Sequence, residues 1–401
     1  MTDGRIVELE VAVIATGLVA LILASLAESG AGVFLGSIHD LIALIPGLLL
    51  LVPASISMRG SVSGVLVSRL ASSMHLGAYE VNFSEESVLG ENIRVSLINT
   101  VLLSFVLGLL ATFVSFLIGD SALSPLDFVL ISVISGVVAG SILLSFTFFV
   151  SFISYRHRLD LDLIGAPSVT SAGDIITLPI IAGVAIGVLA LSSSIRLILG
   201  ILITLLLIAT LWYSYRRIED IRQAVRESMI LLIPLLVLEI IAGTIYNLDV
   251  ALLTDVAALL ILIPPFMGIS GSIGGVLSSR LATGMHMGTI SPTMLPGRDV
   301  LPQVAMTYLY TVLLMPFVAA LAQIAADLLG LQSPGVVVLM EIALVAGLVL
   351  MTLVVLIAQL IAGLSFSYGL DPDNYGIPII TTVIDLIGAF ILVLMMNFFI
   401  G

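Results

Sequence analysis

The chain has 401 residues, of which 60% are hydrophobic and 10% are charged, and its formal net charge is −13. A soluble domain carries roughly 25% charged residues, and repeated apolar runs of about 20 residues match the thickness of a bilayer. The composition therefore predicts an all-α polytopic protein of the cell membrane, with the lipid bilayer as a partner. The acidic balance argues against nucleic acid as a partner, and the absence of cysteine excludes disulfides and thiolate metal sites.

Apolar runs along the chain predict about eleven membrane spans. Their expected ranges are 11–36, 39–58, 94–118, 126–153, 168–191, 195–214, 228–247, 251–269, 301–327, 334–363 and 377–400. The segments 59–76 and 270–287 follow the second and eighth spans after a Gly-Ser pair. We expect each of them to continue as a helix beyond a break, either re-entering the membrane or extending the preceding helix.

The arginines predict the orientation of the spans, because cytoplasmic loops carry an excess of basic residues. All 13 basic residues are arginine, and with a cytoplasmic N-terminus twelve of them, Arg59 included, fall on the cytoplasmic side. Arg196 is the single exception. We therefore expect the N-terminus in the cytoplasm and the C-terminus outside.

An internal repeat at an offset of 211 residues runs through most of the chain without a gap. It pairs Gly32 with Gly243 and Pro53 with Pro264, among many other identities. We assign residues 1–193 to a first repeat, 194–215 to a linker transmembrane helix and 216–401 to a second repeat. Because an even number of spans separates equivalent points, the two five-helix repeats must be parallel. The pseudo-twofold axis then lies along the membrane normal, unlike the inverted repeats of many transporters, and one chain suffices to form the pseudo-dimer.

Two aspartates, Asp174 and Asp385, occupy equivalent positions inside the fifth span of each repeat. Thr170 and Thr381 precede them by four residues, which places threonine and aspartate on one helical face. A charge in hydrocarbon costs at least about 2.5 to 3.5 kcal/mol, so intramembrane carboxylates are usually functional. We expect both aspartates to face a central path and to hold a divalent cation there. Mg²⁺ keeps much of its water and is typically bound by one or two carboxylates.

Three further sets of residues are candidates for the path, each with a structural alternative. Glu28 and Glu239 lie in apolar runs and form either a second cation site, a proton-coupled site or gate, or a protonated contact between helices. The glycine-serine pairs either expose carbonyl and hydroxyl oxygens at a helix break or let helices pack closely. The third set consists of four aspartates at the entrance to the fifth span of each repeat. They form either a cation-attracting vestibule or solvated charges at a helix N-terminus. The pairs are Gly60-Ser61 and Gly271-Ser272, and the vestibule residues are Asp160, Asp162, Asp371 and Asp373.

Three segments resemble a known family. PASISMRGSVSGVLVSRLASSMHLG, PPFMGISGSIGGVLSSRLATGMHMG and LDPDNYGIPIITTVIDLIG are similar to signatures of MgtE-type magnesium channels and of the related eukaryotic solute-carrier magnesium transporters. The resemblance covers nearly the whole chain and implies a fused tandem of two five-helix units. It also implies a pore metal site that uses Asp174 and Asp385.

The chain departs from that family in three places. Ser61 and Ser272 stand where the family usually has asparagine. LDLDLIGAP replaces the Asp-Pro-Asp-Asn motif in the first repeat, so we expect unequal entrances. About ten residues precede the first expected span, so we expect no gating by the cytosolic sensor of the bacterial channels.

These observations predict a divalent cation transporter or channel for Mg²⁺, with Mn²⁺ or other divalent cations as further candidates, and no enzymatic activity. A Na⁺- or H⁺-coupled exchanger is the first alternative, and flux that requires such a gradient would identify it. An intramembrane aspartyl protease, in which two aspartates share a proton, is a remote alternative that cleavage of a helical substrate would identify. A non-catalytic scaffold would leave the matched carboxylates without a purpose.

Overall fold

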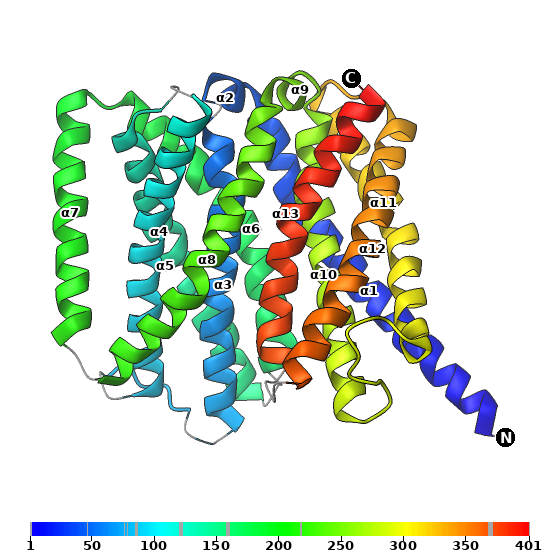
Figure 1. The fold of residues 1–401 in the computed structure, drawn as a ribbon. Coiled ribbons are helices and arrows are strands. Elements are labelled where there is room, and N and C mark those ends of the chain that lie inside the picture. The colour runs from blue at the N-terminus through cyan, green and yellow to red at the C-terminus, as the bar shows by residue number, and fades with distance from the viewer. Residues whose placement is uncertain are drawn as a thin grey trace. The chain divides into compact units, whose positions relative to one another are not determined.

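The computed structural model describes residues 2–45, 47–75, 77, 79–84, 87–119, 123–157, 161–216, 219–367 and 372–400. These residues form thirteen α-helices and one 3-10 helix, and no strand occurs among them (Figure 1). The helices are α1 (Thr2–Ser37), α2 (His39–Leu44), α3 (Leu48–His75), α4 (Val88–Ile118), α5 (Pro125–His157), α6 (Leu161–Ala190), α7 (Ser193–Arg216), α8 (Glu219–Leu248), α9 (Val250–Asp255), α10 (Ala258–His286), η1 (Arg298–Val300), α11 (Leu301–Leu329), α12 (Val336–Ser367) and α13 (Pro372–Ile400).

Eleven helices in the described part of the chain are long and apolar enough to cross a membrane, which confirms the predicted number. Residues 59–75 and 270–286 of these segments belong to α3 and α10, which run without interruption. The expected break after each Gly-Ser pair is therefore wrong, and both segments extend the preceding helix. The second and eighth spans also begin later than expected, because the short helices α2 and α9 precede them.

The chain divides into two compact units, unit 1 with residues 1–40 and 251–401, and unit 2 with residues 41–250. Helix α1 packs on α10 and α11 within unit 1, and α8 packs on α3 and α4 within unit 2 (Figure 1). The first long helix of each predicted repeat thus belongs to the same unit as four helices of the other repeat and packs on two of them. The predicted boundaries at 193/194 and 215/216 concern the sequence repeat and stay a prediction.

The exchanged helices are α1 and α8, each of which packs in a unit made mostly of the other repeat. In each unit, a proline and a glycine explain how the exchanged helix is held. Pro53 in α3 has no N–H for the carbonyl four residues earlier, which belongs to Leu49. Gly243 of α8 lies at this point, since a Cβ there would be 2.8 Å from the Leu49 oxygen. The bare Cα can therefore approach a carbonyl that the helix leaves unpaired, in the manner of Cα–H···O contacts between helices.

A similar contact occurs in unit 1, one residue further along α10 than the offset of 211 predicts. Pro265 of α10 leaves the carbonyl of Ile261 without its helical donor, and Gly32 of α1 lies against that oxygen. A Cβ at Gly32 would overlap with it. The repeated glycines seen in the sequence therefore mark the two helix crossings that fix α1 and α8 in their units.

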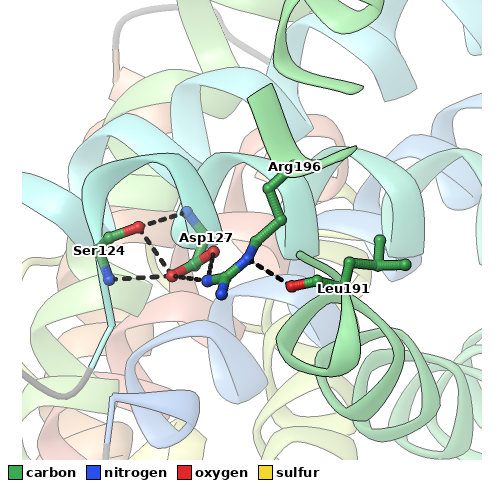
Figure 2. Close-up of polar contacts among 4 residues, drawn as sticks. All are labelled: Ser124, Asp127, Leu191 and Arg196. Atoms are coloured by element: carbon green, nitrogen blue, oxygen red, sulfur yellow. Dashed lines mark hydrogen bonds and ion pairs between the residues drawn. The ribbon is translucent and has the colours of Figure 1, made fainter. Parts of the chain in front are cut away.

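Helix α7, the predicted linker span, lies at the edge of unit 2 against α5 (Figure 1). Its first turn is held by Arg196, whose Nη1 lies 3.0 and 3.2 Å from the two carboxylate oxygens of Asp127 in α5 (Figure 2). Arg196 also donates from Nε to the carbonyl of Leu191 after α6, at 3.1 Å. Ser124 and Asp127 bond reciprocally as a capping box at the start of α5. One arginine therefore joins the ends of three helices.

We predict that Gly32→Ala destabilises the protein, because the added Cβ meets a backbone oxygen that cannot move aside. Overpacking of this kind costs about 1–3 kcal/mol, which thermal unfolding in detergent will show as a lowered midpoint. Gly30→Ala is the matched control, since a Cβ there meets no described atom within 4 Å. Equal midpoints for the two variants would contradict the crossing described above.

We predict that Arg196→Gln lowers the unfolding midpoint, because it leaves the buried carboxylate of Asp127 without its cation. Leaving a buried acceptor short of a partner costs about 1–3 kcal/mol. Arg216→Gln at the other end of α7 is the control, since Arg216 stacks on Trp212 of the same helix. In a double-mutant cycle with Asp127→Asn, additive losses would show that the two residues do not interact.

Candidate functional site

Unit 2 contains a small cavity between α3 and α8 that joins two of the predicted site residues. The polar groups at its wall are Ser57, Ser61 and Glu239, and the remaining lining residues are Met58, Leu232, Leu235 and Leu236. The Ser57 hydroxyl donates to Oε1 of Glu239 at 2.7 Å. Glu239 is 2% exposed, so its carboxyl group is held inside the bundle with a hydroxyl partner. Because α8 is exchanged, the glutamate of one repeat meets the glycine-serine motif of the other.

Helix α6 brings the predicted aspartate of unit 2 to the same helix α3. Thr170 lies opposite Gly60, since a Cβ on that glycine would be 3.7 Å from the threonine Cγ2. Asp174, one turn further along α6, is partly exposed. A Cβ at this distance would make an ordinary van der Waals contact, so the glycine is not required for the approach of α6 to α3. The predicted Gly60, Thr170 and Asp174 lie along one helix pair.

Unit 1 repeats this arrangement with α10 and α13. Thr381 lies opposite Gly271, with 4.0 Å between the threonine Cγ2 and a Cβ built on the glycine. Asp385 follows one turn later and is partly exposed. Glu28 of α1 packs on Gly268 of α10, where a Cβ would lie 2.6 Å from the glutamate Cδ. The position equivalent to Gly268 in unit 2 is Ser57, so the two glutamates have different neighbours.

The glycine-serine pairs do not supply free backbone carbonyls. Gly60-Ser61 and Gly271-Ser272 lie in the middle of continuous α-helices, whose carbonyls accept intrahelical hydrogen bonds. The expectation that these pairs break the helix to expose carbonyl oxygens is wrong. The glycines face the threonine of the fifth helix at ordinary contact distance, and Ser61 contributes a hydroxyl at the cavity.

The four vestibule aspartates cannot be assigned a place. Asp160 and Asp371 lie outside the described residues. Asp162 and Asp373 belong to the first turns of α6 and α13, but their side chains also lie outside what is described. The vestibule stays a prediction.

The sequence did not indicate one polar residue of unit 2, Thr177, and led to a wrong placement of another, Arg59. Thr177, one turn after Asp174, is fully buried, and its hydroxyl has no hydrogen-bond partner in the described part of the chain. Its equivalent is Gly388, so the repeat gave no signal for it. Arg59 was expected in a cytoplasmic loop, but it lies inside α3 and is 2% exposed. It therefore does not count toward the orientation, which rests on the other arginines and stays a prediction.

The chemistry of the site suits a hydrated cation. Within the described ranges, no three histidine or acidic side chains come together in a cluster that could hold a metal ion. A tight cage for a dehydrated ion is therefore not formed by these residues. Single carboxylates with hydroxyls nearby match the way Mg²⁺ is bound through retained water.

Comparison with known proteins agrees with the repeat. The family model "MgtE: Divalent cation transporter" matches residues 52–184 and again 263–395. The two matched ranges are displaced by the same 211 residues as the internal repeat, and each falls within a single unit. They include α6 and α13 as far as both aspartates.

Two curated relatives are similar over most of the chain. Solute carrier family 41 member 3 of Rattus norvegicus is 22% identical over 367 residues, which cover 86% of this chain and 78% of the relative. The protein of the same name from Mus musculus is 22% identical over 369 residues, which cover 86% of this chain and 74% of the relative.

A solved structure, described as the crystal structure of eukaryotic MATE transporter AtDTX14, aligns with a TM-score of 0.32. Its sequence is 15% identical, and the alignment covers 94% of this chain and 96% of that chain. A score this low does not assign the fold. The two family matches together span more than half of the chain, and the protein belongs to the MgtE divalent cation transporter family.

Proposed function

We propose that this protein carries Mg²⁺ across the membrane along a central path between the two repeats, with Asp174 and Asp385 as the principal cation-binding groups. The observation that supports this most is that each unit places one partly exposed aspartate, at equivalent positions, beside a glycine-threonine contact between its helices. Mn²⁺ or other divalent cations are further candidates, since serine replaces the usual asparagine of the family in both repeats.

Single carboxylates from two sides suit a partly hydrated ion. Mg²⁺ sheds its water reluctantly, so a path that binds it through one or two carboxylates and retained water releases it more easily than a closed cage. Thr170 and Thr381, on the same faces as the aspartates, add hydroxyl oxygens that such a hydration shell can bond. The membrane provides little competing solvent, which strengthens each charge interaction.

Glu239 supports a second position along the route. Its carboxyl group lies at the cavity between α3 and α8 and accepts a hydrogen bond from Ser57. A buried carboxyl group beside a cavity can bind a cation or exchange a proton, so Glu28 and Glu239 are proposed as a second binding or coupling site. A Na⁺- or H⁺-coupled exchanger would use them in the second way.

We predict that Asp174→Asn and Asp385→Asn each reduce Mg²⁺ uptake into proteoliposomes by at least about tenfold, the effect of losing about 1.4 kcal/mol of cation stabilisation. The unfolding midpoint should change little, since asparagine preserves the volume of the side chain. Asp255→Asn is the control, because Asp255 is an exposed residue at the end of α9. Wild-type uptake by both variants would reject the proposed path.

The same vesicles distinguish a channel from an exchanger. A panel of divalent ions is tested with and without a Na⁺ or pH gradient. Flux that persists without either gradient supports uncoupled transport, and flux that requires one supports the exchanger.

We predict that Ser57→Ala lowers stability by about 1.5–3 kcal/mol if Glu239 is ionised and by about 0.5–1.5 kcal/mol if it is protonated, because hydrogen bonds to charged groups are stronger. Thermal unfolding at several pH values measures the loss. Ser141→Ala is the control, since the exposed Ser141 hydroxyl bonds to the carbonyl of Val137 in its own helix. No difference between the two variants would show that the Ser57–Glu239 bond contributes nothing to stability.

A further inference from the structure

A buried positive charge lies inside unit 2. Arg59 of α3 is 2% exposed and is surrounded by serines of three helices. Its Nη1 donates to the Ser55 carbonyl at 3.3 Å, and its Nη2 donates to the Ser135 hydroxyl of α5 at 3.4 Å. Its Nε has no hydrogen-bond partner in the described part of the chain. Both bonds are long and both acceptors are neutral, so these contacts solvate the guanidinium only in part.

The surroundings of Arg59 are built from small polar residues. The hydroxyls of Ser55 and Ser104 are buried and lack hydrogen-bond partners in the described chain. Gly136 of α5 leaves room at this point, because a Cβ there would lie 1.9 Å from the Ser104 Oγ and 3.9 Å from the Arg59 Nη2. The guanidinium therefore lies among hydroxyl dipoles, where its charge is not cancelled by a carboxylate of the described residues.

The equivalent place in unit 1 is neutral and mostly apolar. The arginine is replaced by Ser270, which is fully buried. The helix contact itself is retained, since Gly347 lies where Gly136 does and faces Met315 instead of Ser104. The serines around the arginine change together with it: Ser55, Ser104 and Ser135 correspond to Phe266, Met315 and Ala346. A charge and its solvating hydroxyls thus occur as a set in one unit.

Arg59 is close to the groups that line the proposed path. It directly precedes Gly60, which faces Thr170, and it is two residues from Ser61 at the cavity. Residues two apart in a helix point to nearly opposite sides, so the guanidinium and the cavity are separated by about one helix diameter, roughly 10 Å. Salt screens such a buried interaction only weakly. A unit positive charge at that distance weakens the binding of a divalent cation by at least about tenfold at an effective dielectric constant near 20.

We propose that the buried charge of Arg59 weakens cation binding at Asp174 and Glu239 and so favours release of the ion there. The proposal rests on the proposed function, because it assumes that these carboxylates bind the transported ion. Unit 1 has two matching carboxylates, Asp385 and Glu28, and the neutral Ser270 in place of the arginine. The two sides of the path are therefore unequal in affinity, although their carboxylates are equivalent in sequence.

The test measures Mn²⁺ binding to purified full-length protein, with free Mn²⁺ followed by electron paramagnetic resonance. Arg59→Gln and Arg59→Met should bind Mn²⁺ at least about tenfold more tightly than the wild type, and their maximal transport rate should fall because release is slower. Arg59→Lys, which keeps the charge, should bind as the wild type does. A lysine variant that binds as tightly as the glutamine variant would overturn the proposal, because shape rather than charge would be responsible.

A second variant tests the charge without removing the arginine. Ser135→Asp places a carboxylate beside the Arg59 Nη2 and should also tighten Mn²⁺ binding. Wild-type Mn²⁺ affinity in both Arg59→Gln and Ser135→Asp overturns the inference. If the arginine variants do not fold, wild-type affinity in Ser135→Asp alone overturns it. If Asp174→Asn weakens Mn²⁺ binding while these variants have no effect, the proposed function stands and this inference alone fails. If the wild type shows no saturable Mn²⁺ binding, both fall.

Discussion

Carboxylates inside an apolar bundle are the constraint on which this structure depends. Asp174, Asp385, Glu28 and Glu239 lie in spans where an ionised group costs at least about 2.5 to 3.5 kcal/mol. Small groups lie next to two of these carboxyl groups: the Ser57 hydroxyl donates to Glu239, and Gly268 leaves the space that the Glu28 carboxyl group fills. A hydroxyl can donate to a carboxylate without neutralising its charge. A salt bridge such as that of Asp127 with Arg196, in contrast, uses the charge to hold helices together.

Small residues also explain how the exchanged helices α1 and α8 dock in their units. Pro53 and Pro265 each leave a carbonyl without its helical donor, and Gly243 and Gly32 lie against those carbonyls. The repeated glycines Gly243 and Gly32 thus have one physical purpose, which is to dock α8 and α1, although the proline used in α10 is one residue beyond the equivalent of Pro53. Docking α8 on α3 also brings Glu239 to Ser57 and Ser61. A packing contact thus determines which glutamate accompanies which glycine-serine motif.

The sequence was sufficient for those parts of the site that depend on helical spacing. Thr170 and Asp174 share a face because they are four residues apart, and the offset of 211 located their equivalents. It was insufficient where tertiary contacts decide. Nothing in the residues of α1 shows that it packs on α10, because an apolar helix can pack in either unit. Arg59 was misplaced because Gly60-Ser61 resembled a helix end, whereas α3 continues through this pair. Thr177 was missed because its equivalent is glycine.

Repeats that arise from one ancestral unit need not remain equivalent in charge. Ser57, Arg59 and Thr177 of unit 2 correspond to Gly268, Ser270 and Gly388 of unit 1, while the aspartates, glutamates and serines of the motif are retained. The retained residues are those that we propose as cation-binding groups. The changed residues lie near them in sequence and alter the charge without altering the proposed ligands. A homodimer cannot make such a change on one side only, since every substitution appears twice. Fusion of the two repeats in one chain removes that restriction, which is why unit 2 can contain a buried arginine where unit 1 has a serine.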